Sequence, residues 1–539
     1  MATTATTRRR PRRGSKGPNS DLSRTITDCT RRGDAAAAMA AFDAAVSDAD
    51  TPPRLAAHQY NQLLHLLATA DRSSFPTPAA AAARRVFAHM LQAGAPPSEA
   101  TITSLARVTA AADADADNPA SAADEAFQLV ATMKDRYGLS PRLRSYSPVL
   151  AAFRRAGDAA KAYAVEAHMA ASAVSPEEPE LAALLDVSST AGDAGKVYEY
   201  LHKLRQTVDC VSEETAQVVE GWFRSDKAAV ACRTGWDAAE VKDAIAANGG
   251  GCHRLGWLGN GPWTVQRVTV RADGQCGGCG YRLACIDIDM QETQRFADSV
   301  AGLALERETK TNFSQFQEWL EANKGYEAIV DGANIALYQQ NFAEGGFSLT
   351  QQLDAVIAEL RDRYGKCPLV ILHNKRIAKL MENPSNRHLI ETWRANGALY
   401  TSPSGSNDDW YWLYAAIKLN CLLVTNDEMR DHIFELLGSS FFPKWKQRHR
   451  VKYTFNKGKA VLVMPPPYST EIQESDMGSW HIPMEEKSAD ERVRSWLCIG
   501  RASNGAVQEM PSTEASSRMQ QRLPENKAEP VTGKRKDRG

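Results

Sequence analysis

This 539-residue chain has no apolar run near the roughly 18 residues that a transmembrane helix needs, so we expect no membrane span. It also has no excess of positive charge, because 64 Lys and Arg residues stand against 65 Asp and Glu residues. Any nucleic acid must therefore be bound by a local basic patch. The 10 cysteines are scattered, with one close pair, which argues against a disulfide framework and favours a reducing compartment.

Both ends of the chain lack helical or strand periodicity. Residues 1–21 contain a basic run at 8–13 that no apolar segment follows, which excludes a secretory signal peptide. That run is a candidate nuclear-import cluster, and a mitochondrial or chloroplast transit segment is the alternative. Residues 501–539 are polar and end in a second basic cluster. We expect both ends to be disordered and the protein to be nuclear.

Residues 22–220 are rich in alanine, follow helical periodicity and repeat. A Gly-Asp junction recurs 35 residues apart at Gly157 and Gly192, and a proline recurs with the same spacing at Pro141 and Pro176. The interval from Pro97 to Pro141 is longer, at 44 residues, which fits an insertion at 112–119. A period near 35 in paired helices predicts a superhelical α-solenoid of about five repeats.

The pattern Gly-x-x-Pro-x-x-x-Thr/Ser-Tyr-Asn/Ser at these repeats resembles pentatricopeptide repeats. In that family, the start of the first helix faces an RNA groove and contacts bases. The resemblance therefore implies that four side chains at this position contact RNA: Tyr60, Asn61, Thr103 and Ser147. The alternative is that these small polar groups cap helices.

Residues 221–304 lose the alanine-rich character, and alternating apolar residues at 263–271 predict a strand. The segment Cys276-Gly-Gly-Cys279 has the form of a zinc knuckle, in which the glycines let two thiolates face one ion. A structural zinc site needs two more ligands, and spacing alone does not select them. The candidates lie nearby or in the Trp-rich segment 455–500: Cys252, His253, Cys285, His481 and Cys498.

Residues 305–454 alternate between strand-like and helix-like runs. This βαβα order predicts a parallel sheet. Short apolar runs stand at 328–330, 368–373, 398–400 and 422–425. Helical patterns stand at 348–364, 376–397, 407–419 and 428–437.

Four aspartates are predicted to meet at one edge of that sheet. Asp331 and Asp427 end apolar runs, and Asp408 and Asp409 open a helical segment. Because ligands bind beyond the carboxyl ends of parallel strands, we expect these carboxylates to converge. Clustered carboxylates repel unless cations lie between them, and oxygen ligands suit Mg²⁺ or Mn²⁺. The set predicts a metal-dependent nuclease, although any one member could simply cap a helix.

Basic residues follow the second predicted strand at the same edge. His373, Lys375 and Arg376 are candidates to bind the RNA backbone there. A solvated helix start is the alternative interpretation.

The order of these segments along the chain, from about residue 22 to 500, resembles the protein-only RNase P family in its land-plant form. It combines pentatricopeptide repeats, a split Cys-x-x-Cys, His and Cys module, and the motifs Val-Asp-Gly-Ala-Asn, Asn-Asp-Asp-Trp and Thr-Asn-Asp. The resemblance implies a multidomain α plus α/β protein: an α-solenoid, a small β-rich zinc module and an α/β nuclease domain of the NYN or PIN-like type. It also implies an endoribonuclease that removes the 5′ leader of precursor tRNA.

Residue by residue, the resemblance assigns the active-site metal to Asp331, Asp408, Asp409 and Asp427. It assigns zinc to Cys276, Cys279, His481 and Cys498, which leaves Cys252, His253 and Cys285 as bystanders. The implied cofactors are Mg²⁺, with Mn²⁺ as a substitute, and structural Zn²⁺. The implied partner is precursor tRNA, bound by a monomer that needs no RNA subunit. Two alternatives are a NYN-type nuclease acting on other RNAs and a non-catalytic pentatricopeptide repeat protein that binds RNA.

Overall fold

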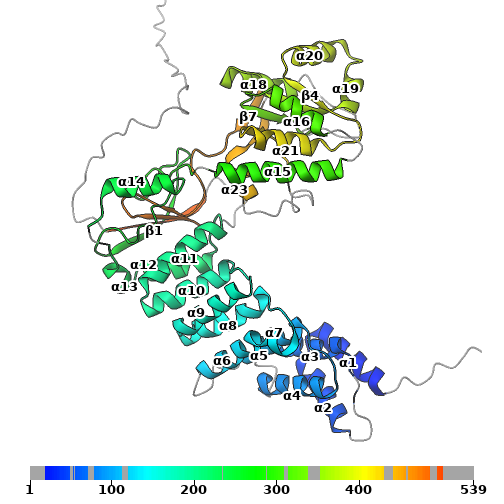
Figure 1. The fold of residues 1–539 in the computed structure, drawn as a ribbon, viewed down its shortest axis with the longest axis vertical. Coiled ribbons are helices and arrows are strands. Elements are labelled where there is room, and N and C mark those ends of the chain that lie inside the picture. The colour runs from blue at the N-terminus through cyan, green and yellow to red at the C-terminus, as the bar shows by residue number, and fades with distance from the viewer. Residues whose placement is uncertain are drawn as a thin grey trace, which may run out of the picture. The chain divides into compact units, whose positions relative to one another are not determined.

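The computed structural model describes most of the chain (Figure 1). The described residues are 18–48, 53, 55–70, 78–111, 119–233, 235–286, 288–308, 313–337, 352–429, 441–456, 459–485 and 494–501. The basic run at 8–13, most of the insertion at 112–119, nearly all of the helical pattern at 428–437 and the tail beyond 501 lie outside them. None of the described helices has the length and apolar character to cross a membrane.

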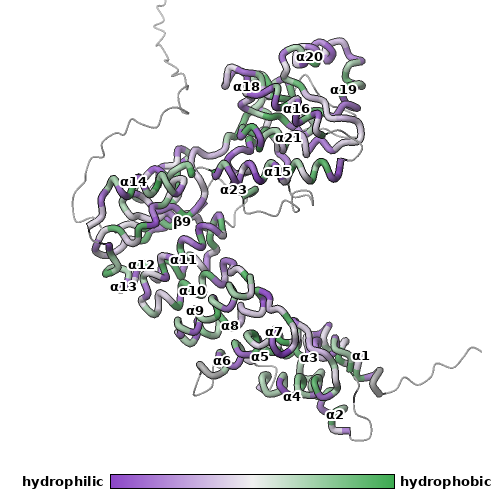
Figure 2. The backbone as a smooth tube through the Cα atoms, in the orientation of Figure 1, coloured by the Kyte–Doolittle hydropathy of each residue, from purple (hydrophilic) through white to green (hydrophobic). Residues whose placement is uncertain are grey.

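The first part of the chain is a series of antiparallel helix pairs, as the repeats predicted. Figure 2 shows apolar and polar residues interspersed along these helices, the pattern of helices that bury one face. The helices are α1 (Pro18–Arg32), α2 (Ala35–Ser47), α3 (Ala57–Thr69), α4 (Ala79–Gln92), α5 (Glu99–Ala111), α6 (Pro119–Ala131), α7 (Met133–Tyr137), α8 (Leu143–Ala156), α9 (Ala159–Ala171), α10 (Glu178–Ala191), α11 (Ala194–Thr207), α12 (Glu213–Phe223) and α13 (Asp226–Val230).

The recurring Gly-Asp junction explains how these pairs turn. Gly157 and Gly192 end α8 and α10 with φ of 67° and 79°, which glycine adopts without steric strain. The aspartate that follows each glycine caps the next helix: Asp158 accepts a hydrogen bond from the Lys161 N–H, and Asp193 does the same for Lys196. Local sequence therefore sets each turn.

The two predicted halves of the central module form one antiparallel sheet with the strand order β1-β10-β9-β8. Its core is continuous with the last repeats, because Trp222 of α12 belongs to the same buried cluster as Trp257, Trp263 and Trp480. The elements are α14 (Ala238–Ala247), β1 (Trp263–Thr269), β8 (Gln473–Glu474), β9 (Trp480–Pro483) and β10 (Ser495–Arg501).

The chain between β1 and β8 forms a six-stranded sheet of order β4-β3-β2-β5-β6-β7. Only its β6–β7 pair is antiparallel. The predicted parallel α/β domain is confirmed. Its strands are β2 (Ala328–Asp331), β3 (Leu369–His373), β4 (Leu399–Ser402), β5 (Leu422–Val424), β6 (Arg450–Asn456) and β7 (Lys459–Val463). Its helices are α15 (Met290–Arg307), α16 (Phe313–Ala322), α17 (Gly332–Ala336), α18 (Asp354–Tyr364), α19 (Asn374–Leu380), α20 (Pro384–Ala395), α21 (Asp408–Lys418) and α23 (Phe441–His449).

The structure corrects one predicted helix and the two predicted ends of the nuclease domain. The single helix expected at 376–397 is divided into α19 and α20, because Pro384 cannot continue a helix and Asn383 caps a new one. Helix α15 packs into the nuclease core through Phe296 and Val300, so this domain begins near 290 rather than at 305. Strand β7 extends it to about 463 rather than 454.

Candidate metal sites

Asp331 is the most buried of the predicted active-site aspartates, with 4% of its surface exposed. It ends β2 and caps α17, where its Oδ1 accepts the Asn334 N–H at 3.0 Å and its Oδ2 accepts the Thr425 hydroxyl at 2.9 Å. Burial raises the pKa of Asp331 to about 7; the two hydrogen bonds oppose this rise, and the negative charges of Asp408 and Asp409 add to it. The three carboxylates therefore share one electrostatic environment.

Asp408 and Asp409 occupy the first turn of α21, as the sequence predicted. Asn407 caps this helix by accepting the Asp409 N–H at 3.2 Å, and the Glu308 carboxylate accepts the Asn407 N–H at 2.8 Å. Both aspartates are half-buried. A helix start also favours negative charge, so this position stabilises two adjacent carboxylates.

Asp427 follows β5 at the same edge of the sheet. Its N–H donates to Thr425 Oγ1 at 3.1 Å, and its Oδ1 accepts the Met429 N–H at 2.7 Å. The structure therefore places all four predicted aspartates after strands or at a helix start on the carboxyl edge. Among the described residues, the four aspartates do not lie close enough to one another to form a compact group of metal ligands. The cysteine and histidine set described below is the only such group there.

The aspartate set fits a hard divalent cation. It supplies only oxygen donors, and a buried Asp331 carboxylate near the charges of Asp408 and Asp409 is the environment that a cation would relieve. Oxygen ligands of this kind suit Mg²⁺ and Mn²⁺.

The basic residues at this edge have a structural role as well. The His373 ring caps α19 by accepting the Lys375 N–H at 3.2 Å, and Lys375 and Arg376 are exposed. The helix-start interpretation therefore holds for His373. Contact of Lys375 and Arg376 with RNA stays a prediction.

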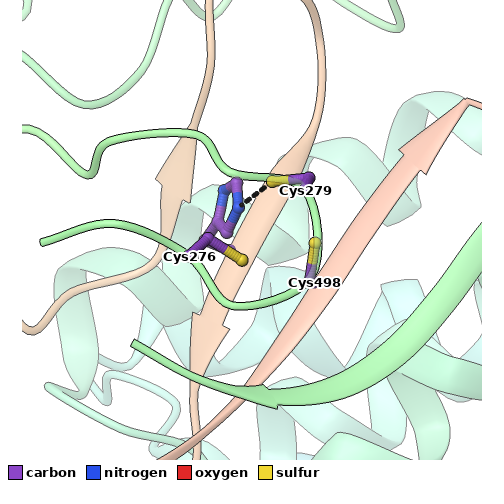
Figure 3. Close-up of side chains that lie close together, drawn as sticks. Cys276, Cys279 and Cys498 are labelled. Carbon is purple, nitrogen blue, oxygen red and sulfur yellow. Dashed lines mark hydrogen bonds between the residues drawn. The ribbon is translucent and has the colours of Figure 1, made fainter. Parts of the chain in front are cut away.

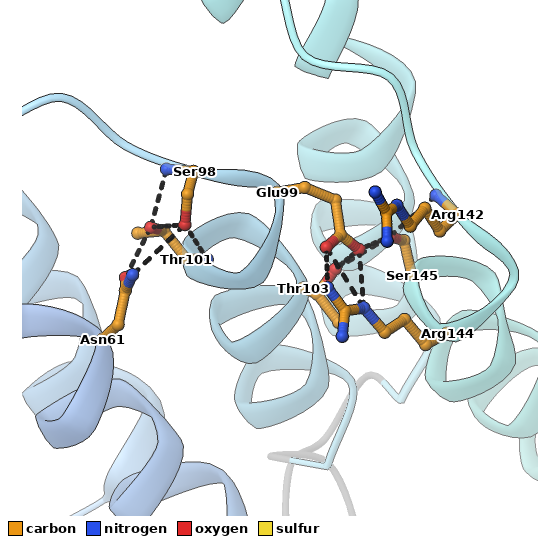
Figure 4. A network of polar contacts seen from close by, with 8 residues as sticks. All are labelled: Asn61, Ser98, Glu99, Thr101, Thr103, Arg142, Arg144 and Ser145. Atoms are coloured by element: carbon orange, nitrogen blue, oxygen red, sulfur yellow. Dashed lines mark hydrogen bonds and ion pairs between the residues drawn. The ribbon is translucent and has the colours of Figure 1, made fainter. Parts of the chain in front are cut away.

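In the solenoid, the structure corrects the assignment of Tyr60. Tyr60 is fully buried and its hydroxyl lies 2.9 Å from His89 Nδ1, so it packs between helices instead of facing RNA. Thr103 is 5% exposed, and its hydroxyl contacts Glu99 at 2.9 Å and Ser145 at 2.7 Å (Figure 4). Neither side chain is available to a base in this conformation.

Asn61 and Ser147 are half-buried and bond to the next repeat. The Asn61 Oδ1 accepts the Thr101 hydroxyl at 2.6 Å (Figure 4), and the Ser147 hydroxyl donates to Glu180 at 2.6 Å. Together with Thr103 and Ser145, they form a ladder that ties each first helix to the following one. Their contact with RNA stays a prediction, and one that the sequence alone could not separate from repeat packing.

The structure brings together the four zinc ligands that the family resemblance assigned. The donor atoms of Cys276, Cys279, His481 and Cys498 all lie within 4.8 Å of one another, and Cys279 Sγ is 3.2 Å from His481 Nε2 (Figure 3). His481 and Cys498 are register partners in the β9–β10 pair. Because the three thiols lie this close together, they interact strongly, and a bound cation would stabilise them as thiolates.

The two glycines of the knuckle are required by close approach. A Cβ on Gly277 would lie 2.8 Å from the Thr269 carbonyl oxygen, and one on Gly278 would lie 2.8 Å from the Val268 side chain. Three sulfur donors and one imidazole nitrogen fit a tetrahedral zinc ion.

The remaining candidates lie outside this group. Cys252 contacts the Arg205 guanidinium at 2.8 Å, His253 contacts Glu474 at 3.0 Å, and Cys285 is exposed.

Comparison with known proteins identifies the family. The family model described as the pentacotripeptide-repeat region of PRORP matches residues 9–230, and the model of protein-only RNase P matches residues 270–498. Proteinaceous RNase P 2 of Arabidopsis thaliana is 47% identical over 502 residues, which cover 91% of this chain and 93% of the relative. The chain belongs to the protein-only RNase P family.

A further relative and a solved structure agree with this assignment. Proteinaceous RNase P 3 of Arabidopsis thaliana is 48% identical over 506 residues, 92% of this chain and 86% of that protein. The crystal structure of nuclear proteinaceous RNase P 2 from A. thaliana has a TM-score of 0.79 at 47% identity and covers 90% of this chain and 100% of that chain. As a protein-only RNase P, this chain is an endoribonuclease that removes the 5′ leader of precursor tRNA.

Proposed function

We propose that this RNase P cuts its substrate at the carboxyl edge of the nuclease sheet, by Mg²⁺-dependent hydrolysis. Asp331, Asp408, Asp409 and Asp427 would hold the metal. The observation that carries the proposal is the buried Asp331 carboxylate, which ends β2 on the sheet edge and lies near the charges of Asp408 and Asp409. A buried group with a perturbed pKa and charged neighbours is typical of a functional site.

The protein's own residues prepare this edge for a phosphodiester. When bound, Mg²⁺ or Mn²⁺ supplies Lewis acidity and a nucleophilic water for in-line attack, which leaves a 5′-phosphate on the tRNA. Asp331 is held by two hydrogen bonds, so its orientation is fixed before substrate arrives. Asp408 and Asp409 point about 100° apart on α21, so they serve different positions at the edge. Lys375 and Arg376, exposed beyond β3, would hold the RNA backbone.

We further propose that the cluster of Cys276, Cys279, His481 and Cys498 holds a structural zinc ion. The four donors are gathered from both halves of the central module, which supports a role in joining them. A closed site with four protein ligands leaves no open position for substrate, so this metal would stabilise the fold instead of taking part in cleavage.

We propose that the protein acts on precursor tRNA as a monomer without an RNA subunit, in the nucleus. The family name supports the protein-only enzyme, and one structural relative is titled as nuclear. The mitochondrion or chloroplast is the alternative location, and a relative named chloroplastic/mitochondrial is 44% identical.

Cleavage of a 5′-labelled precursor tRNA by purified protein tests the proposed site. We expect one cut at the mature 5′ end with Mg²⁺, no cut with EDTA, and cleavage slowed by roughly 100-fold or more in Asp409→Asn. Competition with an unstructured RNA of equal length would separate a tRNA enzyme from a nuclease that acts on other RNAs. Binding of tRNA without cleavage by the wild-type protein would leave a non-catalytic RNA-binding protein.

A further inference from the structure

Thr425 lies between the two aspartates that end parallel strands. It is fully buried. Its hydroxyl donates to Asp331 Oδ2 at 2.9 Å and accepts the Asp427 N–H at 3.1 Å. A single hydroxyl therefore contacts residues on two neighbouring strand ends, β2 and β5, which pair in the sheet.

We infer that Thr425 is a positioning residue for the active-site metal. It would orient the Asp331 carboxylate toward the cation that Asp427, on the neighbouring strand end, also faces. The inference rests on the proposed function of the aspartates. Groups that hydrogen-bond to metal ligands orient those ligands and tune their affinity for the ion.

The two donors to Asp331 leave room for metal. An ionised carboxylate has about four acceptor positions. The Asn334 N–H takes one on Oδ1 and the Thr425 hydroxyl takes one on Oδ2, so each oxygen keeps a lone pair for a cation. The carboxylate is oriented by a hydrogen bond at each oxygen and can still coordinate a cation.

The turn at 425–427 has other supports, which isolates the role of the hydroxyl. The Asn426 N–H and the Tyr453 hydroxyl both donate to Asn334 Oδ1, at 3.0 and 2.7 Å. The Asn426 side chain also bonds to both backbone polar groups of Tyr453, at 3.0 and 2.9 Å. Because Asn426 already fixes the backbone here, the Thr425 hydroxyl acts chiefly on the carboxylate.

The alternative is that the Thr425 hydroxyl only satisfies buried polar groups. That role predicts a loss of stability in any variant lacking the hydroxyl, with no change in metal affinity. A positioning role predicts weaker metal binding in a protein that is still folded.

The test compares Thr425→Val, which keeps the shape and loses the hydroxyl, with Thr425→Ser, which keeps the hydroxyl. The first measurement is the Mg²⁺ concentration that gives half-maximal cleavage of precursor tRNA. The second is Mn²⁺ binding to the RNA-free protein, followed by electron paramagnetic resonance. We expect Thr425→Val to weaken both by about 10- to 100-fold, the range for partners of metal ligands, and Thr425→Ser to stay near wild type.

Two reference variants make the outcome interpretable. Thr293→Val removes another buried threonine hydroxyl, one that donates to the carbonyl of Asp289 at the N-cap of α15, and should leave metal binding unchanged. Asp409→Asn reports on the proposed site itself. If Asp409→Asn cleaves at the wild-type rate, the proposed function fails; if its cleavage is about 100-fold slower or more and Thr425→Val matches wild type, only the positioning inference fails.

Other results would also overturn the inference. Loss of metal affinity in Thr425→Ser, with Thr425→Val near wild type, would assign the effect to packing of the methyl group. A lower melting temperature with unchanged Mn²⁺ affinity would show that the hydroxyl is merely structural. If Thr425→Val does not fold, Thr425→Ala takes its place in the comparison with Thr425→Ser.

Discussion

Cys279 Sγ lies 3.2 Å from His481 Nε2, although 202 residues separate the two in the chain. Those residues include every strand of the nuclease sheet. The nuclease domain is therefore inserted into the central module. The cysteine and histidine group and the β1–β10–β9 strand pairs join the two halves of that module.

This arrangement predicts one zinc ion per chain that survives dialysis, and a loss of stability when a ligand is removed. Cys276→Ser should lower the melting temperature by about 5 °C or more, because a structural zinc ion contributes directly to folding. Mass spectrometry under native conditions and thermal unfolding would measure both. Cys285→Ser is the matched control, because that cysteine is exposed and outside the group. A metal-free protein with an unchanged melting temperature would contradict the zinc assignment.

The active-site proposal predicts a separation of cleavage from binding. Asp408→Asn and Asp409→Asn should each slow cleavage by roughly 100-fold or more, since a bound metal contributes several kcal/mol to transition-state stabilisation. Affinity for precursor tRNA, measured by filter binding in Ca²⁺, should change little. Asp362→Asn on α18 is the control for loss of one exposed carboxylate. Parallel losses of binding and cleavage would show that the aspartates support the fold.

The burial of Tyr60 predicts an effect on stability and none on RNA. Tyr60→Phe removes the contact between its hydroxyl and His89 Nδ1, so the free energy of unfolding should fall by about 1 kcal/mol. Affinity for tRNA below the melting temperature should equal that of wild type. Tyr137→Phe, at a half-buried position on α7, is the control. A drop in tRNA affinity without a drop in stability would restore Tyr60 as an RNA contact.

Glu474 predicts a pH dependence of stability at the junction between α11 and the central sheet. The carboxylate is 1% exposed and lies 3.0 Å from His253 Nε2 and 3.5 Å from His202 Nε2. Burial by itself raises the pKa of Glu474, but the two adjacent imidazoles, of His202 and His253, hold this pKa below its usual 4.5. The folded state therefore binds this proton less readily than the unfolded state does. The stability that Glu474 adds is present above pH 4.5 and is lost as pH falls through the lowered value.

Urea unfolding of wild type and Glu474→Gln from about pH 6 to pH 3 would measure this dependence. The wild-type protein should lose more free energy of unfolding than the variant below pH 4.5, because glutamine cannot titrate. Equal slopes of the free energy of unfolding against pH for the two proteins would show that stability does not depend on the charge of Glu474.

The sequence indicated those parts of the molecule that a few adjacent residues specify. The Gly-Asp junctions at 157–158 and 192–193 predicted the turns between helices because a left-handed glycine and a capping aspartate act within one turn. Apolar runs ending in Asp331 and Asp427 predicted strands with carboxylates at one edge, since parallel strands present their carboxyl ends together. The family motifs then assigned the remaining zinc ligands that spacing left open.

Only the tertiary structure decided the features that depend on contacts between distant segments. The pairing of β9 with β10 places His481 opposite Cys498, and the packing of α15 moves the start of the nuclease domain to about 290. Tyr60 carries no mark in the sequence that separates a buried hydroxyl from one that faces RNA. Thr425 likewise stands in the sequence as an ordinary residue at a strand end. Its contact with Asp331, 94 residues away, exists because β2 and β5 lie side by side in the sheet, and strand order is set by packing of the whole domain.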